Sequence, residues 1–190
     1  MFQLFSRLAP STIAATAALI AVSAVACASG GGSAGGTGPS PEVTSAFTKV
    51  TPSERVYTVE DLRAIGMRAN LQYRVEGLPN AVDAWRCIYQ QKEFEARFYS
   101  SHQDAVEYGT PLADEATGPD AILFGEGVSW KEGIMNRKIC GHFAIGSAAN
   151  AGCNAKFGDY AIYGNLVLLC EGENSEESLA RCAGVLENLE

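Results

Sequence analysis

The residues most able to do chemistry are two histidines, His102 and His142, and six cysteines. His102 precedes Asp104 by two residues, and both fit the first turn of a helix, where the helix dipole stabilises negative charge. His142 follows Cys140 by two residues, which suggests a Cys–His nucleophile pair. An oxidised Cys140 could not act as a nucleophile, so we expect no catalysis from either histidine.

Other common catalytic patterns do not match the sequence. Gly146-Ser147-Ala148 lacks the second glycine of a nucleophile elbow. The acidic residues from Asp114 to Glu126 lack the alternating spacing of a calcium loop. We therefore expect neither a metal nor a cofactor. A glycosidase-type carboxylate pair is defined in space rather than in sequence, so a small hydrolase stays open as an alternative.

Cys27 ends a segment that is typical of export signals. Residues 1–7 carry Arg7 and the amino group, and residues 8–26 contain no charge. A positive start, an apolar centre and a small-residue exit are the parts of a cleaved signal peptide, which we assign to residues 1–26. Ala24-Val25-Ala26-Cys27 resembles the bacterial lipobox, with Ala24 where that motif usually carries Leu. The resemblance implies a lipoprotein that is acylated on Cys27 and anchored to a membrane.

We expect residues 27–53 to form the lipidated cysteine and a flexible tether. Residues 28–41 contain only Gly, Ser, Ala, Thr and Pro, so no side chain there is large enough to pack. A chain of this kind has a reach of ~20 Å and would hold a single globular domain, residues 54–190, clear of the membrane. The alternatives are a retained N-terminal anchor helix and a secreted protein without lipid.

The charge balance limits the partners. The chain has a net charge of −8, and removal of residues 1–26, whose one charged side chain is Arg7, makes it −9. A negative surface disfavours nucleic acid, whose phosphates need basic groups, and also disfavours anionic lipid head groups. We predict no nucleic-acid partner and membrane contact through the lipid anchor alone.

Five cysteines remain in the predicted domain: Cys87, Cys140, Cys153, Cys170 and Cys182. Export would place them in an oxidising compartment, where disulfides persist. The pairs closest in sequence, Cys140–Cys153 and Cys170–Cys182, would each close a loop of about a dozen residues, worth roughly 3 kcal/mol. We predict these two bonds and a buried free thiol at Cys87. A bond from Cys87 to Cys170 or Cys182 is the alternative.

The central segment, residues 118–157, is long and irregular in pattern, as many binding loops are. It concentrates aromatic and basic side chains, which binding surfaces favour. We take Trp130, Arg137, His142 and Phe143 as candidate binding residues. The alternative is that Trp130 and its aromatic neighbours cover the core beneath the loop.

Apolar residues alternate with polar ones in residues 84–89 and 94–99, which predicts strands with one buried face, and two further strands flank a turn at Gly164-Asn165. The predicted strands are residues 84–89, 94–99, 159–163 and 166–170. In the second of these, Phe94, Ala96 and Phe98 alternate with Glu95, Arg97 and Tyr99. We expect residues 90–93 to form one hairpin connection and Gly164-Asn165 to form the other.

Capping residues predict the helices. Thr58 and Asp61 can form a capping box, Ser101 can begin a second helix, and Asn174 or Ser175 a third. The order strand–strand–helix therefore occurs twice, over 84–117 and 159–189. We predict an α+β fold in which the two units form one antiparallel sheet with the helices packed on one face. This order is similar to that of small extracellular lipoprotein and sensor domains, which implies no particular ligand.

Taken together, the sequence predicts an exported cell-envelope protein, held to a membrane by lipid, whose domain is a non-catalytic binding or sensor module. Its ligand would be an unknown protein or small molecule. Two other functions stay open, a small extracytoplasmic hydrolase and a structural envelope lipoprotein.

Overall fold

The computed structural model describes residues 47–140 and 152–189, and there the chain builds a six-stranded sheet in the order β1-β7-β8-β4-β3-β2. Its strands are β1 (Val50–Thr51), β2 (Arg68–Gln72), β3 (Ala81–Tyr89), β4 (Lys92–Tyr99), β7 (Phe157–Tyr163) and β8 (Leu166–Glu171). A separate two-stranded ribbon is made of β5 (Lys138–Cys140) and β6 (Cys153–Ala155). With four α-helical segments in the described residues, the predicted α+β class is confirmed.

Both predicted strand–strand–helix units are present. The β3–β4 hairpin leads into α2 (His102–Asp104), a π-helical turn η1 (Ala105–Gly109) and α3 (Thr110–Ala116). The β7–β8 hairpin leads into α4 (Ser175–Leu186). The two units meet at the centre of the sheet, where β4 and β8 pair antiparallel with Phe94 opposite Cys170.

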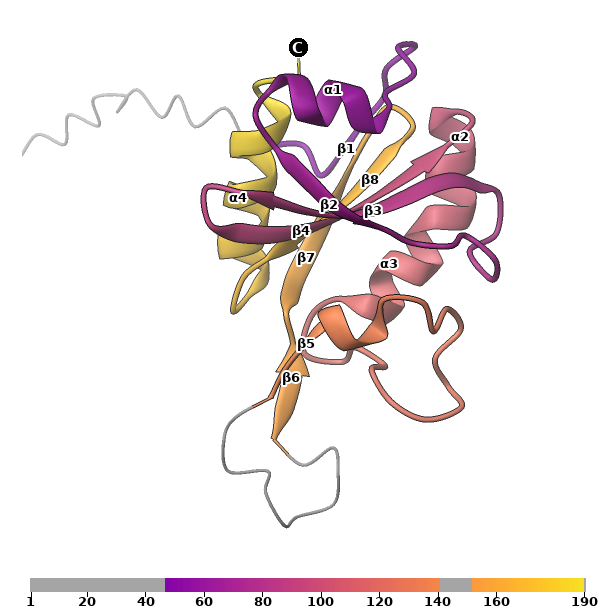
Figure 1. Cartoon of the computed structure of the whole chain (residues 1–190), viewed down its shortest axis with the longest axis vertical. Coiled ribbons are helices and arrows are strands. Elements are labelled where there is room, and N and C mark those ends of the chain that lie inside the picture. Colours follow the sequence, from indigo (N-terminus) through magenta and orange to yellow (C-terminus); the bar gives the residue numbers. More distant parts are fainter. Residues whose placement is uncertain (1–46, 141–151, 190) are drawn as a thin grey trace, which may run out of the picture. The chain divides into compact units, whose positions relative to one another are not determined.

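The helices cover both faces of the sheet, which corrects the prediction that they pack on one face (Figure 1). One core, shared with α1 (Val59–Ala64) and α4, includes Leu62, Phe94, Leu168, Cys170 and Cys182. The core on the opposite face, shared with η1 and α3, includes Ala105, Tyr99, Ala113, Val167 and Leu169. The reason is the composition of β8, whose residues 166–170 are apolar and buried without interruption. A strand that is apolar on both faces needs a covering layer on each side.

The sheet extends closer to the N-terminus than the predicted domain boundary at residue 54. β1 pairs with β7 in parallel, with Val50 opposite Ile162, so the sheet is mixed rather than purely antiparallel. Lys49 supports this strand, since its Nζ lies 2.6 Å from Asp159 Oδ1. Residues 49–51 therefore belong to the folded unit and not to the tether.

Local signals position the helices as the sequence predicts. Thr58 and Asp61 form the capping box of α1, and Ser101 Oγ accepts from the Asp104 amide at the start of α2. Pro111 lies two residues after Gly109, the last residue of the π-helical turn η1. Because proline lacks an amide hydrogen and its ring conflicts with the carbonyl four residues back, the helix widens before it continues as α3.

The segment 117–137 covers the sheet beside α3 instead of projecting as a loop. Trp130 packs with Tyr73, Leu78 and Ala84 in a third core cluster. The chain then turns through η2 (Ile134–Asn136) into β5. Gly133 has a φ of 70° and lies so close to Tyr73 that an added Cβ would be 2.8 Å from its ring, so glycine is required there.

Candidate functional site

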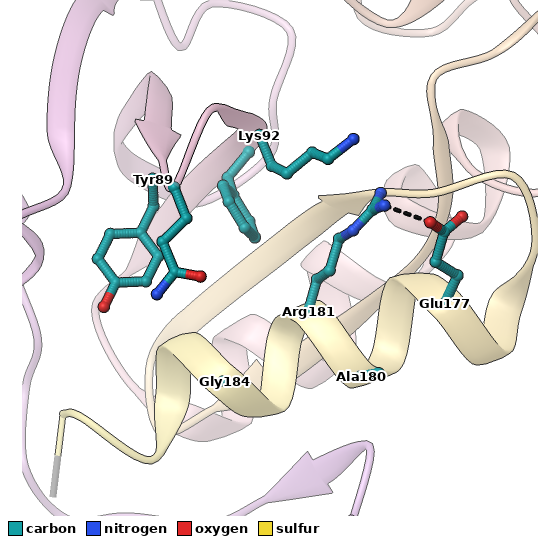
Figure 2. Close-up of a pocket in the computed structure, with 8 residues that line it drawn as sticks. Tyr89, Lys92, Glu177, Ala180, Arg181 and Gly184 are labelled. Atoms are coloured by element: carbon teal, nitrogen blue, oxygen red, sulfur yellow. Dashed lines mark hydrogen bonds and ion pairs between the residues drawn. The ribbon is translucent and has the colours of Figure 1, made fainter.

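A cleft of about 460 Å³ lies between the end of the β3–β4 hairpin and one side of α4 (Figure 2). This volume falls in the range of small-molecule sites, roughly 300–1,000 Å³. Aromatic, small, amide and charged residues line it, namely Tyr89, Gln90, Lys92, Phe94, Glu177, Ala180, Arg181 and Gly184. We call it the α4 cleft and treat it as the candidate functional site.

A sharp turn builds the hairpin wall of the α4 cleft. Only Gln90 and Gln91 link β3 to β4, and both are left-handed, with φ of 47° and 65°. The predicted connection over residues 90–93 is therefore shorter, with Lys92 already in β4. Two-residue turns of this kind suit a twisted hairpin but normally use Asn, Asp or Gly. Backbone strain of this type is concentrated at functional sites.

Small residues on α4 leave room opposite this turn. Ala180 and Gly184 lie one helical turn apart and face the cleft. A Cβ added to Gly184 would meet no heavy atom within 4 Å, so the wall is open at that point. Figure 2 shows the Tyr89 ring on the Gly184 side of the cleft and the Arg181 guanidinium on the Glu177 side.

The charged groups of the α4 cleft are held by neighbouring acceptors. Arg181 Nη1 donates to the Glu171 carbonyl oxygen at 2.6 Å, and Nη2 forms an ion pair with Glu177. Lys92 Nζ lies 3.2 Å from Glu171 Oε1. Bonds on two sides orient the guanidinium before any ligand arrives, which lowers the entropy cost of binding. The cleft thus combines an aromatic wall with positioned hydrogen-bonding groups.

Trp130 and Arg137 lie inside the protein, which corrects their prediction as binding-surface residues. Each side chain is only 2% exposed. They contact one another, because Arg137 Nη1 donates to the Trp130 carbonyl at 2.9 Å and the guanidinium stacks 4.2 Å from the Trp130 ring centroid. The alternative reading of Trp130 as a core residue is the one that its burial supports. His142 and Phe143 lie outside the described residues.

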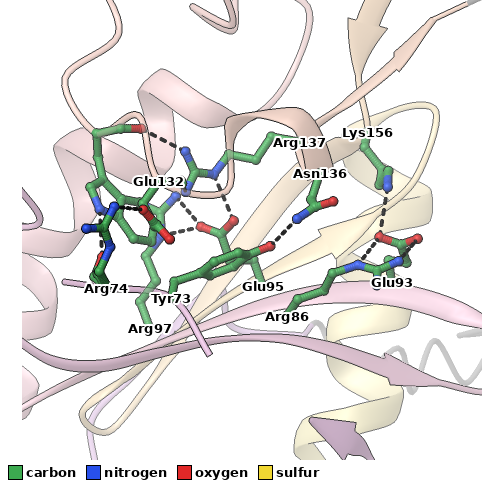
Figure 3. Close-up of polar contacts among 11 residues, drawn as sticks. Tyr73, Arg74, Arg86, Glu93, Glu95, Arg97, Glu132, Asn136, Arg137 and Lys156 are labelled. Carbon is green, nitrogen blue, oxygen red and sulfur yellow. Dashed lines mark hydrogen bonds and ion pairs between the residues drawn. The ribbon is translucent and has the colours of Figure 1, made fainter. Parts of the chain in front are cut away.

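A buried ion cluster holds Arg137 in place, and sequence reasoning missed it. Glu95 accepts from Arg97 Nε at 2.7 Å and from Arg137 Nε at 2.8 Å (Figure 3). Burial raises the pKa of Glu95, but the charges of Arg137 and Arg97 outweigh it, so the net pKa is lowered. Along β4, Glu95 and Arg97 lie on the face opposite to the apolar residues. From sequence alone, a strand face with charged residues is expected to be exposed to solvent. The one sequence signal for this cluster is that Glu95 and Arg97 carry opposite charges and are two residues apart, which places both side chains on the same face of β4.

The cysteines pair as the spacing predicts. Cys140 is bonded to Cys153, Cys170 is bonded to Cys182, and Cys87 is a buried free thiol. Burial raises the pKa of Cys87 to about 12, so this thiol is unreactive at neutral pH. Two disulfides in one domain indicate an oxidising, extracytoplasmic location. Cys27 lies outside the described residues.

A second polar cluster joins three elements at the surface. Asp159 of β7 accepts from Lys49 and from the Ser175 hydroxyl at the start of α4. Burial raises the pKa of Asp159, but the hydrogen bonds from Lys49 and Ser175 outweigh it, so the pKa is lowered. A carboxylate of lowered pKa is a weak base, so this cluster fits an anchoring role better than activation of Ser175.

Two further observations concern the described residues 47–140 and 152–189. No group of three or more His, Cys, Asp or Glu side chains there is placed to hold a metal ion. No helix within the same residues is long and apolar enough to cross a membrane.

One family model matches the chain. It covers residues 58–190, which begin at the N-cap of α1, and it is described as a family of unknown function (DUF6810). No curated protein and no solved structure matches the chain.

Proposed function

Since the chain belongs to the DUF6810 family, whose function is unknown, we propose a function from its own residues: an exported, lipid-anchored, non-catalytic binding protein that takes a small ligand in the α4 cleft. The lipobox-like sequence at Cys27 and the tether support the anchored location. The two disulfides support maturation in an oxidising compartment.

The composition of the α4 cleft carries the binding proposal. Tyr89 offers aromatic surface above the buried Phe94, and Gln90, Lys92 and Arg181 offer hydrogen-bond donors around it. Concave sites that are partly apolar and carry a few oriented polar groups are the usual form of small-molecule sites. Ala180 and Gly184 on the opposite wall leave the space that a ligand would fill.

The ion pairs indicate the class of ligand. Lys92 and Arg181 already contact Glu171 and Glu177, so the cleft carries little unbalanced charge. A strongly charged ligand would have to displace these pairs, whereas an uncharged one can use the donors that remain. The preferred ligand is therefore an uncharged ring-shaped molecule with a hydrogen-bonding edge, such as a sugar or an aromatic heterocycle.

Filling the cleft provides the test. Gly184→Leu places a side chain in open space, and leucine has a higher helix propensity than glycine by about 0.7 kcal/mol, so the fold should be kept. We expect the wild type to bind members of a panel of monosaccharides and aromatic heterocycles in ligand-observed NMR. Gly184→Leu should weaken that binding by at least about tenfold, because the ligand and the new side chain compete for one space.

A matched variant separates this effect from general damage. Glu176→Leu puts the same side chain on an exposed position of α4 outside the cleft lining and should bind like the wild type. Equal binding by the wild type and Gly184→Leu would reject the α4 cleft as the site. A ligand recovered in cleaved form would favour the hydrolase alternative.

A further inference from the structure

The buried ion cluster on β4 carries an unbalanced charge. Glu95, Arg97 and Arg137 are each no more than 2% exposed, and together they hold one negative and two positive charges. Buried charge is costly in the protein interior unless an opposite charge compensates it. Stacking of both guanidinium groups on Trp130, at 5.1 Å for Arg97 and 4.2 Å for Arg137, offsets only part of this cost.

The two arginines differ in how their donors are used. Arg137 donates to Glu95, to the Trp130 carbonyl and to the Glu132 carbonyl, so both its Nη atoms are paired. Arg97 Nη1 has no hydrogen-bond partner among the described residues. The unpaired donor is therefore on Arg97, and the extra positive charge belongs to the two guanidinium groups that share Glu95.

A second unpaired polar group lies beside it. Tyr99 is fully buried, and its hydroxyl also has no hydrogen-bond partner within the part of the chain that the structure describes. Arg97 and Tyr99 are two residues apart on β4, so their side chains leave the same face of the sheet. Two buried polar groups on one strand face thus lack protein partners, and a water molecule or an ion is the usual partner of such groups.

The elements around these groups are closely packed. Across the sheet, Arg97 lies between Ala84 of β3 and Val167 of β8. Above Tyr99 runs the π-helical turn η1, where a Cβ added to Gly109 would lie 3.0 Å from the Tyr99 ring. π-Helical turns are rare and are frequently found at functional sites. Such surroundings exclude any ligand larger than a single small ion or a water molecule.

We propose that Arg97 Nη1 and Tyr99 Oη bind a small monovalent anion of the chloride class beneath the π-helical turn. The anion accepts one hydrogen bond from each group and balances the extra positive charge. A water molecule would satisfy the hydrogen bonds and leave the charge unbalanced. Because the site is closed by the core, the anion is a structural ligand that stabilises the folded state.

Thermal unfolding of the mature chain, residues 27–190, tests the proposal. Chloride is raised at constant ionic strength, with gluconate as the balancing anion that is too large to enter. We expect the Tm to rise with chloride, since a ligand bound only by the folded state stabilises it. Tyr99→Phe keeps the ring and removes the hydroxyl, so it should weaken the chloride affinity by about tenfold.

Tyr160→Phe is the control. It also removes one tyrosine hydroxyl, but the Tyr160 hydroxyl donates to Asp114 and takes no part in the proposed site. It should keep the chloride dependence of the wild type. Crystals grown in bromide should show an anomalous peak within hydrogen-bonding distance of Arg97 Nη1 and Tyr99 Oη. This measurement needs no variant, so it decides the question even if Tyr99→Phe does not fold. A Tm independent of chloride, or water without an anomalous signal at this position, would overturn the proposal.

Discussion

Glu95 determines much of the internal arrangement of this domain. It lies on a central strand of the sheet, and its two carboxylate oxygens accept from two guanidinium groups. Their residues are far apart in the chain, with Arg97 on β4 and Arg137 at the end of the segment 117–137. Arg137 in turn holds two carbonyls of its own segment, at Trp130 and Glu132. One carboxylate therefore fastens a covering segment of the fold to a central strand.

Replacing this carboxylate should be among the most damaging conservative changes. Glu95→Gln leaves two buried cations without their counter-charge, so we expect a loss of about 3–5 kcal/mol in the free energy of unfolding, measured by urea titration. Glu60→Gln is the control, because it removes the carboxylate of an ion pair, with Arg63, in which the Glu60 side chain is 71% exposed. An exposed ion pair contributes little to stability, so this variant should unfold at nearly the wild-type urea concentration. An unchanged urea midpoint for Glu95→Gln would show that the cluster does not stabilise the fold.

The same carboxylate predicts the pH dependence of stability. The pKa of Glu95 is lowered from 4.5 in the folded state, so its contribution is complete above that value and is lost as the pH falls through the folded pKa. Wild-type stability should therefore decrease on acidification below about pH 4.5, and Glu95→Gln should flatten that decrease. Glu93 and Asp159, whose pKa values are also lowered, will leave part of the acid sensitivity in the variant.

Among the elements, α4 is the most firmly attached. Asn174 caps it by accepting from the Glu177 amide, and Ser178 Oγ accepts from the Gly158 amide of β7. The Cys170–Cys182 bond ties its middle to β8. A helix fixed at its start and middle gives the α4 cleft a rigid wall, and a rigid site binds with a smaller entropy cost.

The two disulfides should differ in their resistance to reduction. Cys170 and Cys182 are fully buried, whereas Cys140 is exposed at the end of β5. Treatment of the native protein with a mild reductant, followed by alkylation and peptide mass spectrometry, should label Cys140 and Cys153 first. Cys170 and Cys182 should be labelled only when the domain unfolds, because a reductant must reach the sulfur. Equal labelling rates at the two bonds would contradict this burial argument.

For the whole molecule, we predict attachment to a membrane through lipid alone. The mature protein should partition into detergent and carry acyl chains on Cys27, while Cys27→Ala should be released or stay unprocessed. With a net charge of −9 after residue 26, high salt should not release it, since no electrostatic attraction to anionic lipid is involved. An intact mass equal to the unmodified polypeptide from Cys27 would contradict the anchor.

The sequence by itself determined the local features of this protein. The positions of β3 and β4 follow from alternation, the helix starts follow from Thr58, Ser101 and Asn174, and both disulfides follow from cysteine spacing. These features depend on residues close together in the chain, where a period of two or a single capping side chain limits the backbone to one conformation.

Only the tertiary structure decided which surfaces are covered. Alternation along β4 shows that its two faces differ, but it does not show that η1, α3 and the segment 117–137 cover the polar one. That covering buries Glu95 and Arg97 and turns Trp130 into a core residue. The α4 cleft likewise depends on contact between the β3–β4 turn and α4, which are about 90 residues apart in the sequence. Contacts between distant elements are set by how apolar layers pack, and local pattern carries no information on that choice.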